Sequence, residues 1–260
     1  MKRITTIFAL LSIFMSTASF TANAASDIAV KNLTATRTWE VSAENKEFAP
    51  EGEKCKIDFD FELPTGNDVT SVSVRNWIAS TMGIEGKAST DINSLIDSYV
   101  YYVKHRNEDG SNADMTDEVT VKKIYETSKL VTFEISGYEY FFGAAHGMPY
   151  CIGMTFRKSD GKPMSENLIK KGARLNTLLI AGLKKYFDVK TNSQLKEELF
   201  DSNLSKLKVP GSAPYVTKDG VVFQYSPYEI APYAAGMPTA VISIAKITPF
   251  LTTEGKALLK

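Results

Sequence analysis

The chain has 260 residues, 43% of them hydrophobic, and its 30 basic residues are balanced by 30 acidic residues. This length suffices for one large domain or two small ones with a sizeable core. The balanced charge argues against nucleic acid or an anionic membrane surface as a partner, because both attract strongly basic proteins.

The first 24 residues have the features of a secretory signal peptide. Lys2 and Arg3 form a basic start, residues 7–15 form an apolar run, and residues 22–24 supply the small side chains that precede cleavage. The apolar run is shorter than the roughly 20 residues that span a bilayer. We therefore expect a soluble periplasmic or secreted protein with no membrane anchor after cleavage.

The chain has two cysteines, Cys55 and Cys151. Oxidising compartments outside the cytoplasm permit disulfides. Cys55 lies on the apolar parity of an alternating stretch, whereas Cys151 lies on the opposite parity from Ile152 and Met154. A disulfide bridge and two packed free thiols both stay open. Two separated cysteines and two histidines lack the spacing of a zinc site, so we expect no metal and no cofactor.

Alternation and helical periodicity predict the elements of the first half. Residues 28–42 favour an extended structure, and residues 54–63 alternate polar and apolar side chains as a half-buried strand does. A helix is expected over residues 69–82, and an amphipathic helix over residues 92–103. The polar run 106–118 is expected to be a loop.

The second predicted helix has clear end signals. Thr90 or Asp91 is placed to cap its N-terminus, and Lys104, His105 and Arg106 follow at its C-terminal end, where cations suit the helix dipole. This position gives His105 a sufficient structural explanation.

The second half mixes strands with helices. Two β-like runs, 118–127 and 129–142, predict a hairpin. The remaining predicted elements are a strand from residue 150 to an Asp-Gly turn at 160 and 161, a helix over 165–187, a short helix with capping-box residues Thr191 and Gln194, strands at 221–226 and 239–246, and a C-terminal helix.

The grouping of strands and helices predicts an α+β fold. We expect a largely antiparallel sheet with helices packed on one face and two intimately packed subdomains. The predicted division is a signal peptide at 1–24, an N-terminal α+β companion domain at 25–136 and a C-terminal domain at 137–260.

Two short segments are the candidate site. In "GAAHG", residues 143–147, the glycines allow backbone angles closed to other residues, and the histidine can aim both ring nitrogens at neighbours. The segment "SPYEIAPYAAG", residues 226–236, adds tyrosine and glutamate tips. We expect the segments to lie side by side, with His146 near Tyr228 or Glu229. The candidate ligand-binding or junction residues are Gly143, His146, Gly147, Tyr228, Glu229 and Tyr233.

Enzyme motifs are mostly absent from the chain, and no catalytic residue is assigned. A nucleophile pair of Cys151 and His146 lacks the third group that orients such a base. A small cell-wall hydrolase with His146 and Glu229 as acid and base stays open, as does a structural accessory protein.

The order of three segments carries a family resemblance. "YFFGAAHG", "GMTFRKSDGKPM" and "DGVVFQYSPYEIAPYAAGMP" together resemble the RsiV-like extracellular domain, most strongly over residues 137–258. This domain is the lysozyme-sensing ectodomain of anti-sigma factors and an accessory module of PdaC-type peptidoglycan deacetylases. The resemblance implies an exported, non-catalytic binding module of the cell envelope that engages a lysozyme-like protein or a peptidoglycan fragment. Ala144 stands where the family's motif has a second glycine.

Overall fold

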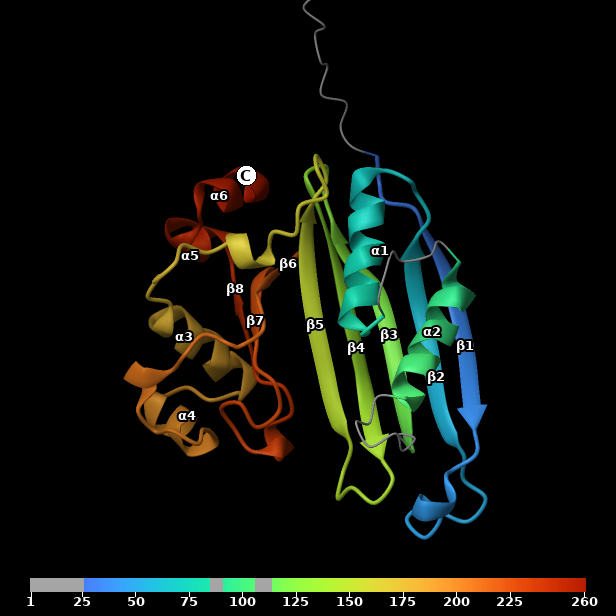
Figure 1. Cartoon of the computed structure of the whole chain (residues 1–260). Coiled ribbons are helices and arrows are strands. Elements are labelled where there is room, and N and C mark those ends of the chain that lie inside the picture. Colours follow the sequence, from blue (N-terminus) through green and yellow to red (C-terminus); the bar gives the residue numbers. More distant parts are fainter. Residues whose placement is uncertain (1–25, 85–90, 106–113) are drawn as a thin grey trace, which may run out of the picture.

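The computed structural model describes residues 26–84, 91–105 and 114–260, and its α+β fold confirms the predicted class (Figure 1). The predicted signal peptide lies outside the described residues. One sheet has the strand order β1-β2-β3-β4-β5, and a smaller sheet has the order β6-β7-β8.

The first sheet consists of β1 (Val30–Trp39), β2 (Cys55–Pro64), β3 (Met115–Glu126), β4 (Leu130–Phe141) and β5 (Met148–Arg157). Its neighbours pair antiparallel except β2 and β3, which are parallel. The chain between these two strands forms helices α1 (Val69–Thr81) and α2 (Ile92–Lys104), the kind of crossover that a parallel pair needs. Both helices cover the same face of the sheet (Figure 1).

The alternation that predicted the second strand is confirmed by burial. Ile57, Phe59 and Phe61 of β2 are buried, and the residues between them are only partly covered. They join Val119 and Phe133 in the core beneath α1 and α2. A polar outer face is left on β2, so this strand is half-buried, as alternation requires.

Side-chain caps begin several of the helices. Asp68 accepts hydrogen bonds from the backbone N–H groups of the first turn of α1, and Asp91 does the same for α2, as predicted. Thr191 and Gln194 form the predicted capping box of α4 (Asn192–Glu198). Each such cap contributes about 1 kcal/mol of helix stability, because it satisfies otherwise orphaned donors.

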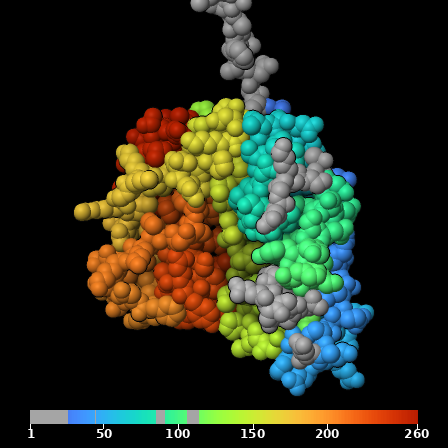
Figure 2. Space-filling model, viewed as in Figure 1, coloured from blue at the N-terminus to red at the C-terminus, as the bar shows by residue number. Residues whose placement is uncertain are grey.

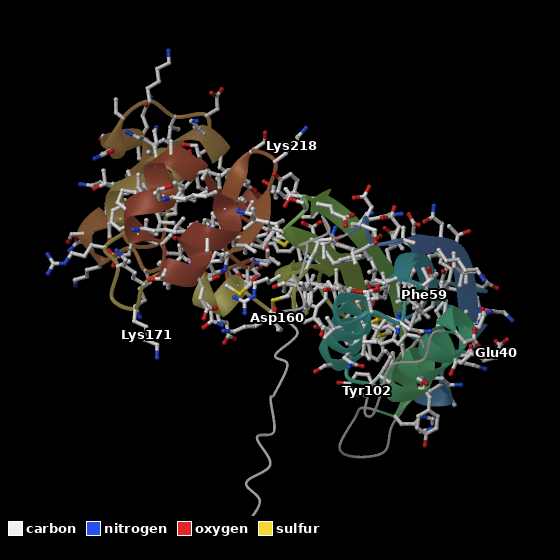
Figure 3. All side chains as sticks on the ribbon, turned by 90° about the horizontal axis from the view of Figure 1, so that it is seen from above. Glu40, Phe59, Tyr102, Asp160, Lys171 and Lys218 are labelled. Atoms are coloured by element: carbon white, nitrogen blue, oxygen red, sulfur yellow. The ribbon has the colours of Figure 1, made fainter. Side chains whose placement is uncertain are left out.

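The second part of the molecule lies beside β5 (Figures 1 and 2). It has its own apolar core. Its remaining elements are β6 (Tyr215–Thr217), β7 (Gly220–Gln224), β8 (Thr239–Ile242), α3 (Asn176–Tyr186), α5 (Ile244–Ile247) and α6 (Thr253–Leu259). Seen from above, Lys171 and Lys218 mark this part, and Phe59 and Tyr102 mark the first (Figure 3).

Hydrogen bonds between polar side chains and backbone join the two parts. The backbone N–H of Val216 in β6 donates to the Thr155 hydroxyl of β5 at 2.8 Å. The Tyr215 hydroxyl donates to Glu134 Oε2 of β4 at 3.0 Å. Gly153 leaves room for this contact, because a Cβ there would lie 2.3 Å from the Tyr215 ring. The small sheet is therefore fixed against the outer face of the large one.

Three predicted elements need correction. The strand expected over 239–246 ends at Ile242, the last residue of β8, and the helix α5 begins at Ile244. The helix expected over 165–187 is a helical turn at 165–167 followed, after a gap, by α3. Between them Ile169 forms a bridge to Leu251, and Gly172 has a positive φ of 73°. The loop expected at 106–118 ends earlier, because β3 begins at Met115, and its residues 106–113 lie outside the described residues.

The predicted domain division stays a prediction. Position 137 lies inside β4, and the strand pairs with β3 and β5 on both sides of that position.

Candidate functional site

The two candidate segments meet where the β4–β5 turn faces residues 226–236. His146 Nε2 lies 3.0 Å from the Tyr228 hydroxyl, which confirms the expected proximity. The His146 ring also stacks on Tyr233, with 3.9 Å between ring centroids and 25° between planes. Together with Tyr138 of β4, these residues form what we call the tyrosine surface (Tyr138, His146, Tyr228 and Tyr233).

The hydrogen bonds of His146 define its proton positions. Nδ1 lies 2.9 Å from the carbonyl oxygen of Gly147, which can only accept, so Nδ1 donates. In the neutral ring Nε2 then accepts from the Tyr228 hydroxyl. The Tyr233 hydroxyl donates to the same Gly147 carbonyl at 2.7 Å, which uses its second lone pair. His146 thus joins the two segments with both nitrogens occupied.

Gly147 is required where it stands. Its backbone N–H donates to the Tyr138 hydroxyl at 3.2 Å, and a Cβ at this position would lie 2.4 Å from the Tyr138 ring. Gly143 has a positive φ of 86°, a conformation that glycine adopts at little cost. The predicted need for glycine at both positions therefore has a structural reason.

Tyr228 combines strain with exposure. Its φ of 64° lies in the left-handed region, which costs a bulky residue about 1–3 kcal/mol. Its side chain is nonetheless 47% exposed. Such strain persists only where the surroundings hold the backbone, and it is concentrated at functional sites.

Glu229 helps to hold the backbone of Tyr228 in this conformation. Its carboxylate accepts from the backbone N–H of Ser226 at 2.8 Å and of Gly211 at 2.7 Å. These bonds fix the turn that carries Tyr228. The structure thus brings His146 to Tyr228 and Tyr233, while Glu229 bonds backbone amides instead.

The cysteines are two free thiols. They lie on β2 and β5, with two strands between them, so roughly 14 Å separates their strands, beyond the limit for a disulfide. Burial raises the pKa of Cys151 to about 12, and burial followed by a hydrogen bond to Asp114 raises that of Cys55 to about 12. Thiolate is therefore scarce at neutral pH, which argues against Cys151 as a nucleophile.

One charged residue escaped the sequence reasoning. Asp117 of β3 is only 1% exposed and accepts hydrogen bonds from Tyr99 at 3.0 Å and Tyr150 at 3.3 Å. Burial raises its pKa to about 6. The sequence held one signal of this burial. Asp117 alternates in step with Met115 and Val119, so it lies on the same buried face of the strand.

Residues 26–84, 91–105 and 114–260 contain neither a metal-binding cluster nor a membrane-spanning helix. No group of His, Cys, Asp and Glu there is arranged to hold a metal ion. Within the same ranges, none of the helices is long and apolar enough to cross a membrane.

Residues 166–245 match a family described as "Protein of unknown function (DUF3298)". This DUF3298 segment contains Tyr228, Glu229 and Tyr233, whereas Gly143, His146 and Gly147 precede it. No curated protein matches the chain.

Two solved DUF3298 structures have a similar fold. A DUF3298 family member from Bacteroides fragilis has a TM-score of 0.68 at 17% identity, over 89% of this chain and 96% of that chain. A DUF3298 family protein from Pseudomonas aeruginosa PAO1 has a TM-score of 0.57 at 14% identity, over 89% and 97%. These two structures therefore share the α+β arrangement of this chain, including the DUF3298 segment, although their sequence identity to it is low.

Proposed function

We propose that the protein is an exported, non-catalytic binding module of the cell envelope, and that the tyrosine surface contacts its ligand. The observation that carries this proposal is Tyr228, an exposed ring on a strained backbone that His146 and Glu229 hold in place. The ligand is a lysozyme-like protein or a peptidoglycan fragment.

The chemistry of the surface supports binding. Tyrosine offers an apolar ring and a polar hydroxyl, a combination enriched in interfaces. The rings of His146, Tyr228 and Tyr233 are already ordered by stacking and hydrogen bonds. A partner therefore has little side-chain entropy to remove, which favours affinity.

The same contacts weigh against catalysis at this place. Both nitrogens of His146 are engaged, Glu229 bonds backbone amides, and Cys151 has a raised pKa. The hydrolase alternative needs a free acid and base within reach of a substrate. A binding role requires neither a free acid nor a free base.

A protein ligand is favoured over a sugar fragment. Phe48 lies close to Gly143 at the β4–β5 turn and is exposed, as are Tyr138 and Tyr228. Apolar side chains that gather on a surface mark protein contacts. The resemblance of the two segments to the RsiV-like domain supports a lysozyme-like partner.

The test is a binding titration of the purified protein with a lysozyme and, separately, with soluble muropeptides. We expect saturable binding of lysozyme, weakened at least about tenfold by Tyr228→Ala, because exposed aromatic anchors dominate such interfaces. Tyr101→Ala on α2 is the matched control, since Tyr101 is also exposed and lies on another element.

Three outcomes separate the alternatives. Binding of muropeptides alone, sensitive to Tyr228→Ala, would assign the sugar ligand. Equal loss in both variants would remove the tyrosine surface from the contact. Absence of any binding at micromolar concentration would contradict the proposal.

A further inference from the structure

A cavity of about 390 Å³ lies where the chain that follows α4 meets the segment 226–236. The backbone N–H of Phe200 donates to the carbonyl oxygen of Ile230 at 2.9 Å and joins the two segments there. The volume is within the range of small-molecule pockets. Buried and half-buried side chains form its apolar wall: Leu199, Leu207, Tyr225 and Ile230.

Side-chain hydrogen bonds hold the irregular segment 199–211 in place. The side-chain amide of Asn176, in α3, donates to the carbonyl oxygen of Leu207 at 2.8 Å. The Tyr225 hydroxyl donates to the carbonyl oxygen of Lys208 at 2.8 Å. These backbone carbonyls therefore have partners within the protein, as buried polar groups require. The cavity is formed before a ligand enters, which lowers the entropy cost of binding.

Two large apolar side chains are exposed at this cavity. Phe200 is 60% exposed and Val209 is 52% exposed, and both line it. Leu199 and Tyr225, which line it too, belong to the apolar core of the second part. Single exposed apolar residues are ordinary, but a pair beside a hollow with an apolar wall marks a place where a ligand is bound. An apolar chain in the cavity would remove both side chains from water, which is favourable.

The polar groups at the cavity leave an excess of hydrogen-bond donors. Lys206 and Lys208 line it and are exposed, and neither ammonium group has an acceptor or an ion-pair partner among the described residues. The lining carboxylates are directed to backbone amides: Glu229 bonds two of them, and Asp201 Oδ1 accepts from the N–H of Asn203 at 2.8 Å. Ammonium groups only donate, so a ligand at this place has to supply acceptors. A carboxylate forms the stronger, charge-assisted kind of bond with lysine.

We propose that this cavity binds a small amphipathic carboxylate, with the acyl chain against Phe200, Val209 and the apolar wall and the carboxylate at Lys206 and Lys208. The carbonyls of the surrounding segment are already bonded. The wall therefore suits an acyl chain, which has no polar groups, better than a peptide backbone, which needs hydrogen-bond partners. The site is separate from the tyrosine surface, because the described lining residues include none of its four members.

The test is a calorimetric and NMR titration of the full chain with sodium octanoate, for which we expect saturable binding. Acetate carries the same charge without a chain to bury, so it should bind at least about tenfold more weakly. Octylammonium and 1-octanol carry the same chain without a negative charge. Each should bind at least about tenfold more weakly than octanoate, because neither gives the lysines a charged acceptor.

Substitutions of exposed residues locate the site. The double variant Lys206→Gln, Lys208→Gln should weaken octanoate binding at least about tenfold. Lys218→Gln is its matched control, since Lys218 is exposed in the turn between β6 and β7. Phe200→Ala should weaken octanoate about fivefold through lost apolar contact, whereas Tyr101→Ala, at another exposed ring, should leave it unchanged. Exposed positions tolerate such changes, and urea unfolding of each variant verifies the fold.

Several results would overturn the site. They are no saturation by octanoate below about 10 mM, equal binding of octylammonium or 1-octanol, and a loss in Lys218→Gln as large as in the double variant. Equal losses in Phe200→Ala and Tyr101→Ala would place the chain elsewhere. N-Acetylleucine carries the carboxylate of a peptide end. Tighter binding of this compound than of octanoate would contradict the acyl chain as the occupant.

Discussion

The imidazole of His146 bonds the hydroxyl of Tyr228, a residue 82 positions later whose backbone lies in the left-handed region. This contact joins the turn of the large sheet to a loop of the second part. The pair helps to hold the two segments together and also presents an exposed ring. Stability and binding measurements can separate these two roles.

His146→Ala should lower the free energy of unfolding by about 1–2 kcal/mol, because two hydrogen bonds and a ring stack are lost at a partly exposed position. Urea unfolding measures the change. His105→Ala is the control, since His105 bonds only within its own helix end at an exposed position. It should stay within about 0.5 kcal/mol. Equal effects of the two substitutions would contradict the role of His146 as a link between segments.

Tyr228→Gly should be more stable than Tyr228→Ala by about 1 kcal/mol, because glycine relieves the positive φ and alanine does not. Thermal or urea unfolding of the pair measures the difference. In the helix α2 the order should reverse: Tyr101→Gly should be less stable than Tyr101→Ala by about 1 kcal/mol. The same order at both positions would show that Tyr228 is not strained.

Asp117→Asn should gain stability relative to the wild type at pH 7, compared with the same difference at pH 4. The folded pKa of Asp117 is about 6, above the usual 3.8. The stability that this shift confers is complete below about pH 4 and is lost as pH rises through 6, at roughly 1.4 kcal/mol per pKa unit, or about 3 kcal/mol in all. Unfolding free energies at both pH values test this. A difference between variant and wild type that does not change with pH would refute it.

Gly147→Ala should destabilise the protein by about 1–3 kcal/mol, because its Cβ would enter the space of the Tyr138 ring. Gly211→Ala is the control, since the nearest atom there is Glu229 Oε1 at an ordinary 3.7 Å. Adding Tyr138→Ala to Gly147→Ala should cost less than the sum of the single changes. Strict additivity would mean that the two residues do not collide.

Local signals explain what the sequence predicted correctly. Strand β2 alternates at every step, and the capping residues Asp91 and Thr191 act within one helical turn. The two segments around His146 and Tyr228 could also be recognised as neighbours from their Gly, Pro and aromatic residues. These features depend on neighbours in the chain, so one sequence reveals them.

Long-range contacts explain the failures. The helix expected over 165–187 was extended too far toward the N-terminus, because Ile169 is held by its bridge to Leu251 near the C-terminus. The parallel pairing of β2 with β3 depends on how α1 and α2 cross the sheet. Asp117 was overlooked because its tyrosine partners come from α2 and β5. Of these relationships, only that of Asp117 leaves a local pattern, its alternation in step with Met115 and Val119.

Strand β4 contributes side chains to two different surfaces, one on each face of the large sheet. Tyr138 belongs to one side and Glu139 to the other, although they are adjacent in the chain. A substitution at one position changes the chemistry of its own side and leaves the opposite side's groups in place. Relatives that share this fold are therefore free to diverge at one surface while they keep the other.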